Sequence, residues 1–505
     1  MEFNKKFIKL RDFSLHASEK FPNRIAIKTP NQEITYKDLN TLICKATNAL
    51  YRMGIKKNDR VLIWTKKSIE CIALLHAISE IGAVYVPIDI QVPFNSVLDV
   101  YNNCQAKLMI VEDLKNLSYS HSNPYLIEDL TNLLKKTQDT TMRYIHSNEN
   151  DLAYILFTSG STGEPKGVCL SHKNALAFIN WSNQLIQPTP KDCFASHASF
   201  SFGISVLDLY LPSLNGSALL LIPETLLLIA NKMWEFVEKN QVSIWYSVPS
   251  ALVYLANSPK LCKSLSKQLK IVLYAGEPMD IQTALLLKTN LQKTRLINFY
   301  GNTETNVCSY FEITSESLNA YQIIPIGQPA SYAKLTIEPF LNSDNFNEGE
   351  LLVEGPSVML GYWGSEFKKN NIYHTKDHVK STPDGNFHFL GRMDNVIKFK
   401  GYRISPIEIE SILSKLNSIE HALVFKESHN NNEKLIACIT LKKNFNDSNT
   451  NLKELRDYLS EHLPSYKNIN AFYIFDEMPK NQNGKISRTL AWEKYTQLKK
   501  INKFK

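Results

Sequence analysis

The strongest chemical signal in the sequence is a loop rich in glycine and hydroxyl side chains, LFTSGSTGEPKGV, at residues 156–168. The loop follows a short apolar run that is typical of a buried strand, and its polar and glycine positions are Thr158, Ser159, Gly160, Ser161, Thr162, Gly163, Lys166 and Gly167. Glycines let backbone N–H groups approach an anion, hydroxyls add donors, and lysine adds a positive charge. The segment therefore predicts a phosphate-binding loop, with a flexible polar turn as the simpler alternative.

This loop is not a phosphate loop of the Walker type. Lys166 follows Pro165, and no Gly-Lys-Ser/Thr sequence stands at the spacing that the Walker motif requires. A nucleotide is therefore expected to be held by a different arrangement of glycines and hydroxyls.

The elements that must position this loop are short strands that alternate with helices. Apolar runs at 60–65, 83–88, 107–112 and 154–158 predict strands, and residues 67–82 between the first two place apolar side chains on one helical face. The order strand, helix, strand is a crossover unit that implies a parallel sheet. The same pattern recurs through the runs at 217–223, 243–249 and 270–276.

The character of the sequence changes after residue 346, where short runs joined by Gly and Asn turns favour antiparallel strands. After residue 404 the pattern predicts a helix, two strands and a second helix, at 406–416, 421–427, 434–442 and 452–463. We therefore expect an α/β fold with a large N-terminal domain, 1–393, of mixed, mainly parallel sheets. A small α+β C-terminal domain, 394–505, is expected to follow it.

Composition excludes several classes of protein. The 505 residues are 44% hydrophobic and 21% charged, and 57 basic against 49 acidic side chains give a net charge of +8. Such apolar content is too high for a disordered chain, and 18 Gly and 21 Pro are too few for a collagen-like one. The lysine-rich end at 499–505 is read as a solvated tail, with a basic patch for an anionic partner as the alternative. No nucleic-acid partner is expected.

Cysteine usage and hydropathy bear on the compartment. The eight cysteines include no Cys-x-x-Cys pair, so neither a zinc site nor a redox pair is indicated, and reduced thiols are expected. The apolar stretches at 71–90 and 206–230 are interrupted by polar residues, and the N-terminus lacks the apolar core of a signal peptide. We expect a cytoplasmic protein that does not cross a membrane.

Seven further segments, together with the phosphate loop, carry a family resemblance. They are ITYKDLN (34–40), AVYVPIDIQVP (83–93), FYGNTETN (299–306), GELLVEGPSVMLGYW (349–363), YHTKDHV (373–379), GRMDNVIKFKGYRISPIEIE (391–410) and PKNQNGKISR (479–488). In this order they resemble the motifs of the adenylate-forming superfamily of acyl- and aryl-CoA synthetases, luciferases and nonribosomal-peptide adenylation domains. Within that superfamily the chain looks most like free-standing ligases that load proline or D-alanine onto a carrier protein.

The resemblance assigns an ATP site. It implies that Tyr300 offers an aromatic face to adenine and that Gly276 and Asn298 lie against the edge of the base. It further implies that Thr303 and Glu304 contact Mg²⁺ and the α-phosphate, that Asp377 binds the ribose hydroxyls, and that Arg392 supports ribose and phosphate. Two positions depart from the family pattern, since Asn302 replaces a proline and Lys376 replaces a glycine. An ordinary surface pair is the alternative for Asp377 and Arg392.

The resemblance also assigns a catalytic lysine. Lys485 matches the lysine that reaches the active site from the C-terminal domain, where it bridges the substrate carboxylate and the α-phosphate. A solvated surface lysine is the alternative. Asp394 matches the hinge about which that mobile domain turns, and Gly401 matches a hairpin that lines the thiol tunnel after the rotation.

The implied reaction has two steps. A carboxylate attacks the α-phosphate of ATP to give acyl-AMP and pyrophosphate, and a thiol then attacks the acyl-AMP to form a thioester. No side-chain nucleophile is required, so catalysis rests on positioning and electrostatics. ATP and Mg²⁺ are the expected cofactors.

The substrate pocket contains the most informative departure from the family. Gly203 stands where amino-acid-activating relatives have an aspartate that pairs with the substrate's amino group. Asp208 lies five residues further on, where the resemblance implies an acid on the following helix, too far along the chain to be assumed a substitute. The other positions assigned to the pocket by the resemblance are Ile204, Leu207, Tyr246, Leu273, Ala275, Phe299, Val307 and Cys308. The set is similar to the lining of proline-activating enzymes except at Gly203, Ile204 and Phe299, with ordinary core packing as the alternative. An apolar pocket with one hydroxyl suits a small, compact acid.

The predicted function is ATP-dependent activation of a small amino or carboxylic acid, proline-like by preference, and its transfer to the phosphopantetheine thiol of a separate carrier protein. Two alternatives remain open. The first is the same chemistry with CoA as the acceptor, and the second is a non-catalytic protein that binds adenylate or docks a carrier.

Overall fold

The computed structural model describes residues 7–113, 124–141, 146–159, 165–258, 265–321, 323–340, 346–367, 372–393, 397–429, 432–442, 452–479 and 486–502. The chain forms two compact units. The first comprises Met1–Ile90, Val100–Phe157 and Gly167–Met393, and the second comprises Gln91–Asp99, Thr158–Lys166 and Asp394–Lys505. The mixed α/β architecture predicted from the sequence is confirmed.

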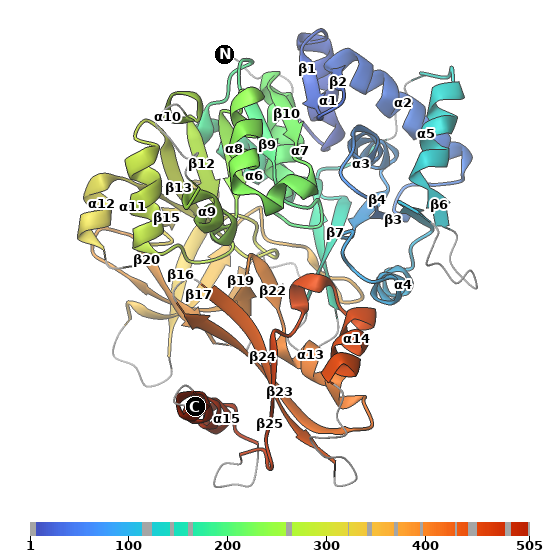
Figure 1. Cartoon of the computed structure of the whole chain (residues 1–505). Helices are drawn as coiled ribbons and strands as arrows, with labels where there is room; N and C mark the ends of the chain where they lie inside the picture. Colours follow the sequence, from blue (N-terminus) through green and yellow to red (C-terminus); the bar gives the residue numbers. More distant parts are fainter. Residues whose placement is uncertain are drawn as a thin grey trace. The chain divides into compact units, whose positions relative to one another are not determined.

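A nine-stranded sheet is the largest element of the first unit (Figure 1). In sheet order its strands are β15 (Gln328–Pro329), β14 (Ser309–Ile313), β13 (Arg295–Tyr300), β12 (Ile271–Tyr274), β11 (Ile244–Ser247), β9 (Cys193–Ser196), β10 (Ala218–Leu221), β1 (Ile25–Lys28) and β2 (Glu33–Thr35). The six strands from β13 to β1 pair in parallel, and the flanking strands β2, β14 and β15 are antiparallel. The parallel core confirms the crossover units predicted from strand and helix periodicity.

A second sheet of seven strands contains the predicted runs of the N-terminal third. In sheet order its strands are β18 (Gly361–Tyr362), β8 (Pro165–Ser171), β7 (Leu152–Ser159), β4 (Val84–Pro87), β3 (Arg60–Trp64), β5 (Leu108–Val111) and β6 (Pro124–Leu126). The helix predicted at 67–82 is α3 (Ile69–Ile81). It begins at Ser68, whose hydroxyl accepts from the N–H of Cys71, and it ends at Gly82 with φ +72°.

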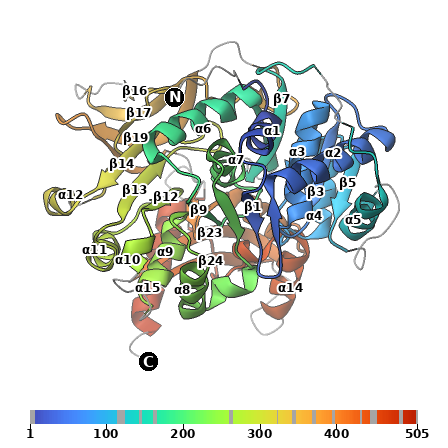
Figure 2. The ribbon, with the colours of Figure 1, turned by 90° about the horizontal axis from the view of Figure 1, so that it is seen from above.

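Helices cover both sheets. They are α1 (Arg11–Lys20), α2 (Tyr36–Arg52), α4 (Phe94–Asn103), α5 (Ile127–Lys136), α6 (His172–Ile186), α7 (Ser205–Asn215), α8 (Ala230–Lys239), α9 (Pro249–Ala256), α10 (Leu265–Gln268), α11 (Ile281–Asn290) and α12 (Ser315–Ala320), with one 3₁₀ turn, η1 (Glu224–Leu228). Seen from above, α1, α6 and α7 lie between β9–β13 of the first sheet and β3–β5 of the second (Figure 2). No helix in the described ranges has the length and apolarity that crossing a membrane requires.

Strand alternation divides the core of the first unit into two clusters. In β12, Ile271 and Leu273 face the cluster shared with α1, α3, α6 and α7, whereas Val272 and Tyr274 face the cluster formed with α8, α9 and α11. Because successive side chains of a strand point to opposite faces, the first of these faces is the one that presents Leu273 to the candidate pocket.

A four-stranded antiparallel sheet completes the first unit. Its order is β16 (Lys334–Pro339), β17 (Glu348–Glu354), β19 (Ile372–Ser381) and β20 (Phe387–Arg392). Its inner face packs Leu351, Val353 and Val379 against Tyr300 and Cys308, which join the end of β13 to this sheet.

The second unit contains the α+β pattern predicted after residue 404. Its described elements are β21 (Ile397–Phe399), β22 (Tyr402–Ile404), α13 (Pro406–Ser414), β23 (Ile419–His429), β24 (Asn432–Leu441), α14 (Leu452–His462), η2 (Ser465–Lys467), β25 (Ala471–Ile474) and α15 (Arg488–Asn502). Strands β23, β24 and β25 form one sheet, and β21 pairs with β22. The two helices and two strands predicted between 406 and 463 are thus confirmed.

Candidate active site

A buried carboxylate, Asp377 on β19, is the centre of the candidate site. It is fully buried and accepts hydrogen bonds from Arg392 Nη1 at 2.6 Å, from the hydroxyl of Tyr300, and from Asn302 Nδ2 at 3.3 Å. Its backbone N–H donates to Thr375 Oγ1 at 3.0 Å, and Arg392 Nη1 also donates to the Thr375 carbonyl at 2.9 Å. The structure therefore brings Asp377, Arg392 and Tyr300 together, and a surface pair is wrong as a description of Asp377 and Arg392.

Tyr300 is held between β13 and this carboxylate. Burial, with the negative charge of Asp377 as a second cause, raises the pKa of the Tyr300 hydroxyl well above its usual value, so the group is a neutral donor. Its ring is 95% buried and packs on the Phe389 ring at a centroid distance of 6.5 Å.

The strand β19 has a left-handed residue just before Asp377, although that residue is not glycine, where its pairing with β17 is irregular. Lys376 adopts φ +57°, a region that disfavours side chains, and its N–H donates to Glu350 Oε1 at 2.8 Å. The carbonyl of Lys376 accepts from the N–H of Met393 at 2.8 Å, which ties this residue to the end of β20. The departure at Lys376 thus leaves the position of the Asp377 carboxylate intact.

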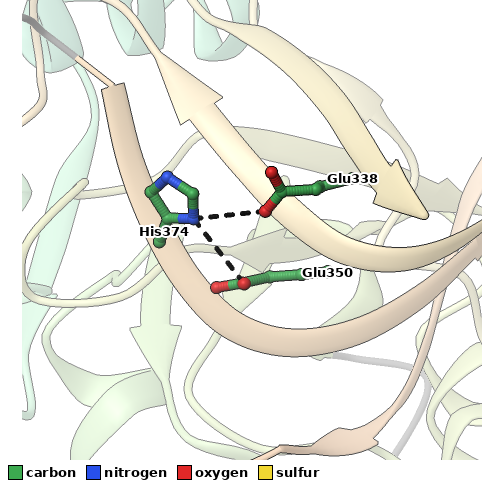
Figure 3. A group of neighbouring side chains, drawn as sticks. All are labelled: Glu338, Glu350 and His374. Carbon is green, nitrogen blue, oxygen red and sulfur yellow. Dashed lines mark ion pairs between the residues drawn. The ribbon is translucent and has the colours of Figure 1, made fainter. Parts of the chain in front are cut away.

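Glu350 belongs to a cross-strand group with Glu338 and His374 (Figure 3). His374 Nδ1 lies 3.5 Å from Glu338 Oε2 and 3.6 Å from Glu350 Oε2. Among the residues that the structure describes, this is the one group of three His, Cys, Asp or Glu side chains close enough to share a metal ion. Glu338 and His374 are each 54% exposed, and an ion-pair group at the surface accounts for the arrangement.

The turn that follows β13 carries Thr303 and Glu304. A Cβ on Gly301 would lie 1.7 Å from the carbonyl oxygen of Asn306, so this turn closes only with glycine at 301. Glu304 is fully buried, and its Oε1 accepts from the Tyr362 hydroxyl at 2.8 Å, while Thr303 is half-buried. Tyr362 was missed in the sequence analysis, although it stands in the quoted segment GELLVEGPSVMLGYW.

Most of the expected pocket residues lie in one apolar cluster. Leu207, Tyr246, Leu273, Ala275, Phe299 and Val307 are buried in it, and Ile204 packs against it. The rings of Tyr246 and Phe299 meet edge to face at 5.7 Å. Cys308 is buried in the neighbouring cluster with Tyr300 rather than in this one. Gly203 precedes α7, and a Cβ there would have Leu156 Cδ1, at 3.9 Å, as its nearest neighbour.

The two residues expected at the edge of the base have different surroundings. Asn298, on β13, is 7% exposed and donates from Nδ2 to the Pro325 carbonyl at 2.8 Å. Gly276, just after β12, has φ +97°, which requires glycine.

Part of the candidate site lies outside the described residues. This holds for Gly160, Ser161, Thr162 and Gly163 of the phosphate loop, for Asp394, and for the catalytic candidate Lys485. Thr158 and Ser159 are the last residues of β7, and Lys166 is the second residue of β8.

Described residues before and after Lys485 have hydrogen bonds to the C-terminal elements. The N–H of Ser487 donates to the Pro479 carbonyl at 2.9 Å, and Arg488 Nη1 donates to Glu410 Oε1 at 2.6 Å. Arg488 also donates to the Val424 carbonyl and lies 5.0 Å from the Phe425 ring. Arg488 therefore anchors the start of α15 to α13 and β23.

Comparisons with known proteins agree with this geometry. The AMP-binding enzyme family matches residues 15–363, and the AMP-binding enzyme C-terminal domain matches residues 408–485. An L-proline–[L-prolyl-carrier protein] ligase of Pseudomonas fluorescens is 32% identical over 490 residues, which cover 95% of this chain and 98% of the relative. A D-alanine–D-alanyl carrier protein ligase of Staphylococcus aureus is 27% identical, with 92% and 95% covered.

A solved structure supports the fold independently. NpsA-ThdA from Klebsiella oxytoca, an artificially fused adenylation–PCP di-domain NRPS, superposes with a TM-score of 0.80 over 93% of this chain and 94% of that chain, at 22% identity.

The chain belongs to the AMP-binding enzyme family. It is an AMP-forming acid–thiol ligase.

Proposed function

We propose that this enzyme activates a small amino acid, proline-like by preference, as an aminoacyl-AMP and transfers it to the phosphopantetheine thiol of a separate carrier protein. The observation that carries the proposal is the buried Asp377–Arg392–Tyr300 group, in a chain that covers 98% of a free-standing prolyl-carrier ligase. The apolar pocket around Tyr246 and Phe299 adds a size limit, because its walls are large buried side chains.

The roles follow from the chemistry of each group. Asp377 supplies the carboxylate for the two ribose hydroxyls, Arg392 supports ribose and phosphate, and Tyr300 offers its ring to adenine. Gly276 and Asn298 border the base. The loop from Thr158 to Lys166 holds the phosphates by backbone N–H groups, hydroxyls and one ammonium.

Mg²⁺ is the metal that this site fits. Glu304 and Thr303 offer only oxygen atoms, which are the ligands that Mg²⁺ prefers, and Glu304 is held in place by Tyr362. When bound, the ion would neutralise charge on the phosphate oxygens. The role of these two residues is to hold it beside the α-phosphate.

The proposed reaction proceeds in two displacement steps, and neither step forms a covalent bond to the enzyme. A carboxylate oxygen of the substrate attacks the α-phosphorus, and the bond from that phosphorus to the bridging oxygen breaks, so pyrophosphate leaves. In the second step the sulfur of the thiol attacks the acyl carbon, the bond from that carbon to the AMP oxygen breaks, and the thiol proton is released. Lys485 is assigned to the first step, where it stabilises the charge that develops between carboxylate and α-phosphate.

Two domains divide this work in the proposal. Residues 1–393 form the adenylation domain, and residues 394–505 form a mobile domain that carries Lys485 and turns about Asp394 between the two steps. The pairing of Arg488 with Glu410 supports this division, because it ties the start of α15, three residues after Lys485, to α13.

The test has two stages. Pyrophosphate exchange should be measured with ATP, Mg²⁺ and a panel of L-proline, D-alanine, L-alanine and acids without nitrogen, and exchange with a small amino acid is expected. Mass spectrometry should then follow thioester formation with a holo-carrier protein and, separately, with CoA. Exchange with none of the acids would contradict the proposal, and a thioester formed only with CoA would establish the acyl-CoA ligase alternative.

A further inference from the structure

Asp208 is a buried carboxylate to which no residue that the structure describes donates a hydrogen bond. It lies in the first turns of α7 with 1% of its surface exposed, and both Oδ1 and Oδ2 lack such a donor. An ionised carboxylate without partners in such surroundings is strongly destabilising. Burial accordingly raises the pKa of Asp208 well above its usual value, and the positive charge of Lys67 opposes this only in part.

Asp208 lies on the same side of α7 as two residues that are expected to line the substrate pocket. Ile204, Leu207 and Asp208 are related by steps of three and four residues, so they lie on one side of the helix. Leu207 belongs to the apolar cluster that contains most of the expected pocket residues, and Ile204 packs against it. Asp208 is therefore the polar member of a helical face that otherwise contributes to this cluster.

A second unsatisfied polar group belongs to the same apolar cluster. The hydroxyl of Tyr246 is buried without a hydrogen-bond partner in the described part of the chain, and the negative charge of Asp208 is among the causes, after burial, that raise the pKa of that hydroxyl. Two unpartnered groups, one carboxyl and one hydroxyl, thus share an otherwise apolar site.

The positive charge of Lys67 acts on Asp208, but the Lys67 ammonium donates its hydrogen bonds to other residues. Its ammonium donates to the carbonyls of Ser196 at 2.7 Å and His197 at 3.1 Å. Lys67 therefore lowers the cost of a negative charge at Asp208 without satisfying either oxygen of the carboxylate.

Resting on the proposed function, we infer that Asp208, assisted by the Tyr246 hydroxyl, is the group that accepts the amino group of the substrate. An ammonium has a positive charge and several N–H donors. It can therefore neutralise the carboxylate and donate hydrogen bonds both to the carboxylate oxygens and to the hydroxyl oxygen. This assignment explains how the site selects an amino acid although Gly203 contributes no side chain. The ligand class is a small amino acid with a free primary or secondary amine.

The test compares two acids of the same shape. L-proline carries the amine and cyclopentanecarboxylate has carbon in its place, so the ratio of their kcat/KM values in pyrophosphate exchange measures recognition of the amine. Asp208→Asn should lower kcat/KM for L-proline about ten- to a hundredfold and leave cyclopentanecarboxylate unchanged or improved. Because the substitution removes an unpartnered carboxyl group, the Tm should stay the same or rise.

A rescue variant and a matched control sharpen the test. Gly203 has room for a side chain, so Gly203→Asp combined with Asp208→Asn should restore much of the preference for L-proline. Asp192 is an equally buried aspartate, but it is satisfied by Lys270 Nζ at 2.6 Å and Ser243 Oγ at 2.7 Å. Asp192→Asn should therefore lower the Tm and leave the substrate ratio as in the wild type.

Clear outcomes would overturn the inference. An unchanged substrate ratio in Asp208→Asn would do so. An equal loss of kcat/KM with both acids, together with a lower Tm, would also do so, because that is the behaviour of a structural partner of Lys67. A wild-type enzyme that activates only acids without nitrogen would overturn it as well, while ATP-dependent adenylate formation would still stand. If Asp208→Asn fails to fold, Tyr246→Phe provides a second arm, and a wild-type substrate ratio in that variant would contradict the inference.

Discussion

At the scale of single residues, the charges of the candidate nucleotide site are fixed by direct pairing. Asp377 accepts from three side chains, Arg392, Tyr300 and Asn302, of which Asn302 is the most distant donor at 3.3 Å. A carboxylate has about four lone-pair sites, so in the proposed function the ribose hydroxyls would use the remaining one and replace the weakest existing bond. Asn302 is the residue that stands where the resemblance implies proline, and its side chain is the donor that the proposal expects a nucleotide to displace.

The Asp377–Arg392 pair yields a first prediction. Asp377→Asn removes one charge and leaves Arg392, whose side chain is 10% exposed, without its ion-pair partner. Breaking a buried pair in this way should cost about 3–5 kcal/mol of unfolding free energy, measured by urea denaturation, and should raise the KM for ATP at least about tenfold.

An exposed pair in the same sheet is the matched control for this prediction. Glu354 lies 3.4 Å from Lys334, and their side chains are 48% and 73% exposed. Glu354→Gln should change the unfolding free energy by less than about 1 kcal/mol. Equal effects of the two substitutions would show that Asp377 is not held as described.

The role of Lys485 yields a second prediction. Lys485→Ala should nearly abolish formation of the acyl-AMP, because the lysine is assigned to the first step alone. Thioester formation from supplied aminoacyl-AMP and the Tm should remain largely as in the wild type. Pyrophosphate exchange and a single-turnover transfer assay measure the two steps separately. Near-normal pyrophosphate exchange in the variant would refute the assignment of Lys485.

At the scale of elements, one tight turn and one irregularity within a strand place the acidic side chains of the candidate site. The turn follows β13 and presents Thr303 and Glu304, and the irregularity lies at Lys376 within β19, just before Asp377. Lys376 has φ +57° there, and Glu350 stabilises this backbone by accepting the Lys376 N–H. His374, which lies close to both Glu338 and Glu350, orients Glu350 for that bond (Figure 3).

The turn after β13 yields a third prediction. In Gly301→Ala the new Cβ would lie 1.7 Å from the backbone oxygen of Asn306, so the turn must open. We expect a loss of more than about 3 kcal/mol of unfolding free energy, together with a strong loss of adenylation because Glu304 moves.

Gly203→Ala is the control for stability, because its Cβ would meet nothing closer than 3.9 Å. Its unfolding free energy should lie within about 1 kcal/mol of the wild-type value. A Gly301→Ala protein as stable as Gly203→Ala would contradict the close approach seen in this turn.

At the scale of the whole molecule, polar groups buried in the core make stability depend on pH. His76 and His172 are buried in the first unit and His197 is partly exposed, and desolvation lowers the pKa of His76 and His197 to about 3 and that of His172 to about 4. Each ring nevertheless has one hydrogen-bond contact, to Ser14 Oγ, the Leu10 N–H and Ser247 Oγ respectively. These histidines are therefore neutral structural groups rather than catalytic ones.

The histidines yield a fourth prediction. The unfolded chain takes up their protons as the pH falls below about 6.5, whereas the folded protein resists protonation until about pH 3 to 4, so stability is lost as the pH falls through this window. The loss should be about 2 kcal/mol per histidine by about pH 4.5. Urea denaturation of the wild type and of His172→Gln, which keeps an acceptor for the Leu10 N–H, measures the contribution of His172. Parallel pH profiles for the two proteins would contradict this account.

The sequence by itself determined the class of protein and most of its elements. Glycines, hydroxyls and charges at 156–168 and at 299–306 predict nucleotide chemistry because these residue types carry the required donors, acceptors and backbone freedom. The predicted helix at 67–82 is α3, and the predicted strands at 243–249 and 270–276 are β11 and β12, since hydrophobic periodicity is a local property.

Only the tertiary structure decided which polar groups meet. Asn302 and Tyr300 reach Asp377 across 75 and 77 residues of chain, and Glu350 supports the backbone at Lys376 from a neighbouring strand. Whether Asp208 has a hydrogen-bond donor likewise depends on packing, and none of the elements that the structure describes supplies one.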